Sequence, residues 1–173
     1  SLIRASTSAA MVCVGAVGVH HFRPDRAGST AAALAGSAHC PVAIVRGEGD
    51  PPGRTRCVVV DVHGSDSGVL VEAGVQEARV RNAPLRAITW RQSTGDDTAT
   101  AEGDRRIRAN LDRRLARWTK RYPDIRVDSA AVHGNLLEYL ATNGESVQLV
   151  VVGARDGERM AEIVGPSGNA VLH

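Results

Sequence analysis

The sequence has few cysteines and no long apolar run, and each shortage excludes a class of protein. Cys13, Cys40 and Cys57 lie far apart without a Cys-x-x-Cys pair, so they are expected to be small buried hydrophobic residues rather than zinc or redox ligands. No apolar stretch approaches the roughly 20 residues that a membrane-spanning helix needs. The net charge of +2 is too small to indicate a nucleic-acid partner by itself. We therefore expect a cytoplasmic protein without a membrane or nucleic-acid partner.

The residue patterns of common catalytic sites are absent as well. The sequence contains no Ser/His/Asp order, no suitably spaced pair of carboxylates and no Gly-Lys-Ser/Thr phosphate loop. His63 and His133 follow predicted strands, but neither has a partner at metal-ligand spacing. We expect no metal and a binding or regulatory protein rather than an enzyme.

Continuous apolar runs predict an α/β fold with buried parallel strands. Continuous runs are expected where helices cover both faces of a parallel sheet. Helical patterns over 67–81, 105–121 and 135–142 separate several of the runs, as in βαβ units. The five clear runs and one weaker run are 11–14, Val42–Val45, 57–62, 85–90, 149–152 and, weaker, 125–131.

The helix predicted over 105–121 carries eight basic residues and one acid, Asp112. Nucleic acid or an acidic protein surface could bind such a face. However, Ile107, Leu111, Leu115 and Trp118 form a single apolar stripe, which favours a helix whose arginines are its solvated side.

A glycine spacing occurs twice. The first copy follows an apolar run and has Gly15, Gly18, Gly28, Ser29 and Thr30; the second copy has Gly153, Gly157 and Gly165. A strand that enters a glycine loop and then a helix can hold phosphate, because backbone amides and the helix N-terminus point at the anion. The same pattern also suits a strand-to-helix turn without a ligand.

The first copy, together with Cys40-Pro41-Val42, resembles the C-terminal third of a universal stress protein domain. The segment 58–65, the run 132–136 and Leu149 to Gly153 resemble the front four-fifths of a second such domain. Between them, 47–55 reads as a Gly/Pro-rich linker. The resemblance implies a first domain over 1–46 and a second, truncated domain over 56–173. The chain would then be a fragment of a tandem protein, and its excess of arginine over lysine indicates a bacterium of high GC content.

The resemblance implies a five-stranded parallel sheet with helices on both faces, of the adenine-nucleotide α-hydrolase-like type. It further implies a stress-response regulator that binds ATP or a related adenine nucleotide and has at most slow ATP hydrolysis. Family members pair through their last strand, here Val42–Val45, within a chain or between copies. An interaction module that acts through this sheet edge and holds no nucleotide is the alternative function.

The two glycine copies differ in how well they match the family's ATP motif. The first site is expected to comprise Gly15, Gly18, Gly28, Ser29 and Thr30. The second is expected to be degenerate, because Pro166 replaces a hydroxyl residue and His63 replaces the family's aspartate. For this chain we expect weak ATP binding or none. The residues of the second site are Asp61, Val62, His63, Gly153, Gly157, Gly165 and Ser167.

Overall fold

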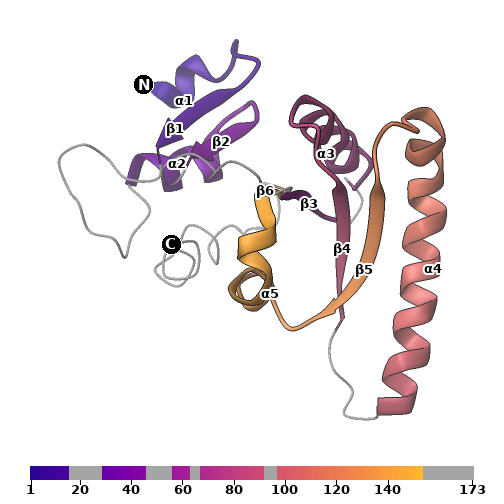
Figure 1. Ribbon diagram of the computed structural model, residues 1–173. Coiled ribbons are helices and arrows are strands. Elements are labelled where there is room, and N and C mark those ends of the chain that lie inside the picture. The colour runs from indigo at the N-terminus through magenta and orange to yellow at the C-terminus, as the bar shows by residue number, and fades with distance from the viewer. Residues whose placement is uncertain (16–28, 46–55, 63–66, 92–96, 154–173) are drawn as a thin grey trace. The chain divides into compact units, whose positions relative to one another are not determined.

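The computed structural model describes residues 1–15, 29–45, 56–62, 67–91 and 97–153 (Figure 1). The chain divides into two compact units, Pro51–Gly153 and a unit that contains Ser1–Asp50. Both have α/β architecture with parallel strands. The predicted linker 47–55 lies outside the described residues.

The first unit contains a two-stranded parallel sheet. Strand β1 (Val12–Gly15) pairs with β2 (Val42–Val45) in a register that runs from Val12 opposite Val42 to Gly15 opposite Val45. Helix α1 (Leu2–Ala5) precedes β1, and α2 (Ser29–Ser37) lies between the strands in sequence. The buried residues of α2 are Ala31, Leu34 and Ala35.

The expectation that Cys13 is buried is wrong. Residues along β1 alternate between half-buried and exposed, and Cys13 is one of the exposed ones. This alternation is the pattern of a strand with only one covered face. The apolar run therefore identified the strand correctly but not its burial.

The second unit contains a four-stranded parallel sheet in the order β5-β4-β3-β6. Its central strand β3 is buried at every residue, in agreement with its unbroken apolar run. The predicted parallel α/β fold is confirmed, with four strands in this sheet and two in the other among the described residues. The strands are β3 (Cys57–Asp61), β4 (Leu85–Arg91), β5 (Val127–His133) and β6 (Val147–Val151).

Helices lie on both faces of this sheet. Figure 1 shows α3 (Ser67–Val80) and α4 (Asp97–Arg121) on one side, and α5 (Leu136–Asn143) on the other. On the α3/α4 face, buried side chains form one apolar core that excludes water from the strands. Its members include Val58, Val60, Val71, Val75, Leu85, Ala87, Leu111, Leu115 and Trp118.

Two of the three helices of the second unit agree with the sequence prediction to within one residue. Helix α4 instead begins at Asp97, eight residues before the predicted start at Arg105. The first two turns contain no apolar stripe, so periodicity could not reveal them. Along the rest of α4, Leu111, Leu115 and Trp118 of the predicted stripe are buried, whereas Ile107 is only partly buried.

Helix α5 starts with a capping box. The Asn135 Oδ1 accepts from the Glu138 amide at 2.9 Å, and Glu138 Oε2 accepts from the Asn135 amide at 3.2 Å. Two backbone donors at the helix start are thereby satisfied. The helix ends at Asn143, one residue after the predicted end, and a 3-10 turn, η1 (Gly144–Ser146), leads into β6. Across the described residues, no helix is long and apolar enough to cross a membrane.

Candidate functional site

The four-stranded sheet has a topological switch point between β3 and β6. From β3 the chain adds β4 and β5 on one side of the sheet, and then returns to place β6 on the other side. In open α/β sheets, ligands bind in the crevice at the carboxyl ends of the strands where this reversal occurs. The switch point therefore marks the candidate ligand site of the second unit.

Three predicted residues of the second site meet at this point. Strands β3 and β6 are parallel neighbours, and Val60 lies opposite Val151. Asp61 and Val62, which follow Val60, therefore lie beside the residues that follow Val151 and end at Gly153. Asp61 and Val62 are 3% and 2% exposed. The remaining predicted members, His63, Gly157, Gly165 and Ser167, lie outside the described residues.

The backbone of Val62 at this site is tied to β4, and Gly153 has room for a Cβ atom. The Val62 amide donates to the Ile88 carbonyl at 2.8 Å, which ties the end of β3 to β4. A Cβ atom built on Gly153 would lie 3.4 Å from Leu70 Cδ1, an ordinary van der Waals distance. Packing among the described residues therefore does not require glycine at 153.

The first predicted site lies in the other unit and is described only at its two ends. Gly15 is the last residue of β1, and Ser29 and Thr30 are the first two residues of α2. Gly15 and Thr30 are exposed. Gly18 and Gly28 lie outside the described residues. The order of strand, loop and helix is the one that a phosphate loop needs.

Sequence reasoning missed the partner of His133. The His133 Nε2 lies 2.9 Å from Asp104 Oδ2, and each side chain is about one-third exposed. His133 ends β5, whereas Asp104 lies in the part of α4 that the periodicity did not reveal. Only the early start of α4 could have suggested the pair. Within the described residues, no group of three His, Cys, Asp or Glu side chains could hold a metal.

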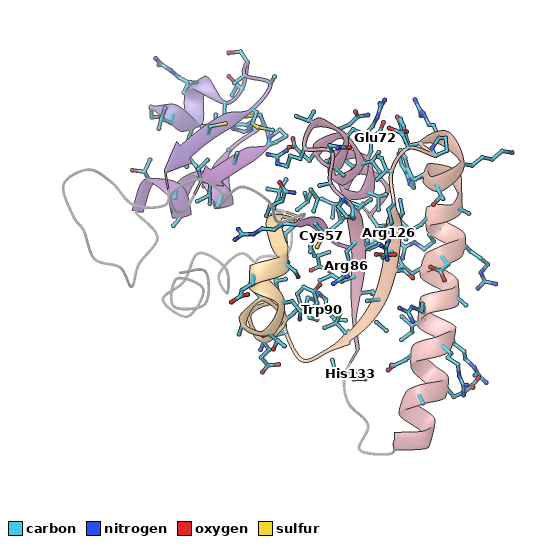
Figure 2. All side chains as sticks on the ribbon, viewed as in Figure 1. Cys57, Glu72, Arg86, Trp90, Arg126 and His133 are labelled. Carbon is cyan, nitrogen blue, oxygen red and sulfur yellow. The ribbon has the colours of Figure 1, made fainter. Side chains whose placement is uncertain are left out.

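A second cluster lies on the α5 face of the sheet, as Figure 2 shows for Cys57, Arg86 and Trp90. The Trp90 and Tyr139 rings meet edge to face with centroids 6.4 Å apart, and Arg86 donates to the Tyr139 hydroxyl at 3.4 Å. This hydrogen bond raises the pKa of Arg86, which therefore stays charged. Burial raises the pKa of the Cys57 thiol, although the nearby Arg86 charge partly opposes that effect.

Most arginines of α4 have contacts within their own unit. The Arg117 guanidinium lies 4.8 Å from the centroid of the Trp118 ring, and that of Arg121 lies 5.3 Å from the Tyr122 ring. Such cation–π contacts cover aromatic rings while the charge stays in water. Further contacts join Arg105 and Arg106 to Glu102, Arg108 to the Ser129 carbonyl, and Arg114 to the Ser67 hydroxyl.

Comparison with known proteins agrees with the resemblance to universal stress proteins. No family model matches the chain. A universal stress protein of Mycobacterium tuberculosis is 60% identical over 178 residues, and a second from the same organism is 42% identical over 172 residues. These sequence similarities support the resemblance of this chain to the universal stress protein family. Each alignment covers 99% of this chain, whereas the chain spans only 61% and 63% of the lengths of these universal stress proteins.

A solved structure agrees with this result at the level of the fold. The crystal structure of a universal stress protein from Archaeoglobus fulgidus superposes with a TM-score of 0.65 at 19% identity. The superposition covers 99% of this chain and 59% of the archaeal one. The α/β fold with a parallel sheet is thus shared with a universal stress protein.

Proposed function

We propose that this chain acts in stress-response regulation and binds ATP or a related adenine nucleotide through the loop that starts at Gly15 and ends at Thr30. In this proposal, the backbone amides of the loop and of the first turn of α2 hold the phosphates, with Gly18 and Gly28 allowing the close approach. The Ser29 hydroxyl donates to a phosphate oxygen. We further propose that such domains occur in tandem in a cytoplasmic protein.

One observation carries this proposal: α2 begins directly where the glycine motif ends. The helix is nine residues long, and its first turn contains no acidic side chain that would repel phosphate. Its positive N-terminal end therefore remains available to an anion. Among the described residues, the sheet of this unit has two strands, β1 and β2, and so offers few strand ends to hold an adenine ring. We therefore expect weak binding.

The site at the β3/β6 switch point is proposed to be degenerate. It has the favourable position in the sheet, but its loop has Pro166 where the first has a hydroxyl residue, and His63 stands in place of the family's aspartate. Proline has no amide to donate to a phosphate. ATP is thus expected to prefer the first loop.

Pairing through a sheet edge is the second candidate function. Among the described residues, β2 is hydrogen-bonded to β1 alone, and Val45 at its end is 60% exposed. Unpaired strand edges recruit partners. In this alternative, Val42–Val45 joins another copy or another domain, and no nucleotide is needed.

Calorimetric titration of ATP into residues 1–173 separates the two candidates. We expect a dissociation constant of about 1 mM, equivalent to about 4 kcal/mol of binding free energy. Replacing Gly18 or Gly28 by valine should abolish ATP binding. Gly36→Ala is the matched control, because a Cβ atom there meets nothing within 4 Å. Binding that survives both valine substitutions, or no binding at millimolar ATP, would contradict the nucleotide proposal.

A further inference from the structure

Strand β5 forms one edge of the four-stranded sheet, and half of its backbone groups point away from the sheet. The Leu85 amide donates to the Arg126 carbonyl at 2.8 Å, so Arg126 and every second residue after it face β4. Among the described residues, no strand pairs with the other side of β5. The amides and carbonyls that face outward are therefore those of Val127, Ser129, Ala131 and His133.

A groove of about 750 Å³ runs along this edge. All seven residues of β5 line it, so the groove follows the strand's edge rather than one of its faces. Arg108 and Asp112 of α4 contribute on one side, and Tyr139 and Asn143 of α5 on the other. We call this feature the β5 groove. The outward-facing amides and carbonyls of β5 form its floor, and these groups are available for hydrogen bonds with an added strand.

The charges in the β5 groove favour an acidic occupant. Arg86, Arg108 and Arg126 all line it. Its carboxylates are Asp112, which accepts from the Ser129 hydroxyl, and Asp128, which pairs with Arg126 at 3.4 Å, so the guanidinium groups outnumber the carboxylates by one. The surplus of guanidinium groups attracts acidic side chains and repels basic ones.

Arg108 contacts the outward-facing backbone of β5 and also carries one of the positive charges of the groove. Its Nε donates at 3.0 Å to the Ser129 carbonyl, one of the outward-facing groups. A peptide amide that takes over this carbonyl would displace the guanidinium. The displaced group is then available to a glutamate or aspartate on the incoming strand, which would compensate for the lost hydrogen bond. A neutral strand offers no such compensation.

We propose that the β5 groove binds an extended acidic peptide of a partner protein, which adds to the sheet as a strand beside β5. Backbone hydrogen bonds supply the pairing, and the three arginines select the charge. A second copy of this chain is the less suitable occupant, because pairing two β5 edges would bring two identical sets of arginines together. Like charges directly opposed are destabilising.

The test uses the whole chain and fluorescein-labelled peptides of about eight residues, a common strand length. One peptide alternates glutamate with valine, and the other alternates lysine with valine. We expect fluorescence anisotropy to show binding of the glutamate peptide only, weakening as salt rises. Substituting Arg86, Arg108 or Arg126 by glutamine should weaken it about fivefold each, as for an exposed ion pair. Arg113→Gln is the control, since Arg113 is exposed on α4 and does not line the groove.

Amide hydrogen exchange tests strand addition separately from charge. The bound peptide should slow exchange at the outward amides of Ser129, Ala131 and His133, and leave the inward amides of Ala130 and Val132 unchanged. A glutamate peptide N-methylated at the alternate amides that face β5 should not bind. Equal binding of both peptides, unchanged outward amides, or full binding of the N-methylated peptide would overturn the proposal. So would protection of these amides that depends on protein concentration without peptide, which would indicate a second copy.

Discussion

The His133 imidazole at the end of β5 lies 2.9 Å from the Asp104 carboxylate on α4. The two residues are 29 positions apart in the sequence, and the contact joins the carboxyl end of an edge strand to the first half of the longest helix. Residues 101–109 of α4 include no buried side chain, so the pair helps to hold this part of the helix against the sheet.

Breaking this pair should lower the free energy of unfolding by a small but measurable amount. For the double-mutant cycle of Asp104→Asn and His133→Gln we expect a coupling of about 0.5 kcal/mol, because both side chains are partly exposed and water screens the interaction. Urea unfolding of the four proteins measures it. Asp124→Asn is a suitable comparison, since Asp124 and its partner Arg79 are more exposed. A coupling near zero would show that the contact does not hold α4.

Gly74→Ala should destabilise the second unit strongly. A Cβ atom at this position of α3 would lie 2.1 Å from Val60 Cγ2 and 3.1 Å from Leu85 Cδ1, inside the packed core. Overpacking of this kind costs about 1–3 kcal/mol, which exceeds the roughly 1 kcal/mol by which alanine improves helix propensity. Urea unfolding should therefore show a net loss.

Gly68→Ala in the same helix is the matched control for that substitution. Its Cβ would lie 3.0 Å from Arg117 Nη2, the far end of a flexible side chain that can move away. We expect Gly68→Ala to be neutral or stabilising. Equal losses for the two substitutions would mean that α3 does not pack on β3 as described.

Cys57 should make the free energy of unfolding fall at alkaline pH. Burial raises the pKa of its thiol above the ordinary value of 9.0. The folded state therefore binds the thiol proton more tightly than the unfolded state, so this contribution is complete below about pH 9 and is lost as pH rises through the folded pKa. Unfolding free energies between pH 8 and 10.5 should fall more steeply for the native chain than for Cys57→Val.

The same burial predicts a difference in thiol reactivity. Cys13 is exposed whereas Cys57 is buried, and the thiolate is the form that alkylates. Iodoacetamide should label Cys13 at least about tenfold faster than Cys57 in the folded chain, as mass spectrometry of the peptides would measure. Equal rates would contradict the burial of β3.

The sequence predicted the elements better than the contacts between them. Unbroken apolar runs marked β3 and the C-terminal part of β6, and the stripe from Leu111 to Trp118 marked the second half of α4. The prediction that Cys13 is buried was wrong. An apolar run indicates a strand, but it does not indicate how many faces of the sheet are covered.

Contacts that depend on sheet order could not be predicted in this way. The pairing of Asp104 with His133 needs both the early start of α4 and the position of β5 at the edge. The β5 groove likewise depends on which strand ends the sheet. In contrast, the family resemblance named Asp61, Val62 and Gly153 together, and these residues lie at or just after the ends of the neighbouring strands β3 and β6; that they form a nucleotide site stays a prediction.

Hydrogen exchange with and without saturating ATP reports which of the two glycine loops holds the nucleotide. We expect slower exchange at the first-turn amides of α2, at Thr30 and Ala31, in the native chain and in Gly36→Ala but not in Gly28→Val. The amides of Val62 and Gly153 should change little. Protection confined to Val62 and Gly153, or none at either site, would contradict the proposal that the first loop binds ATP.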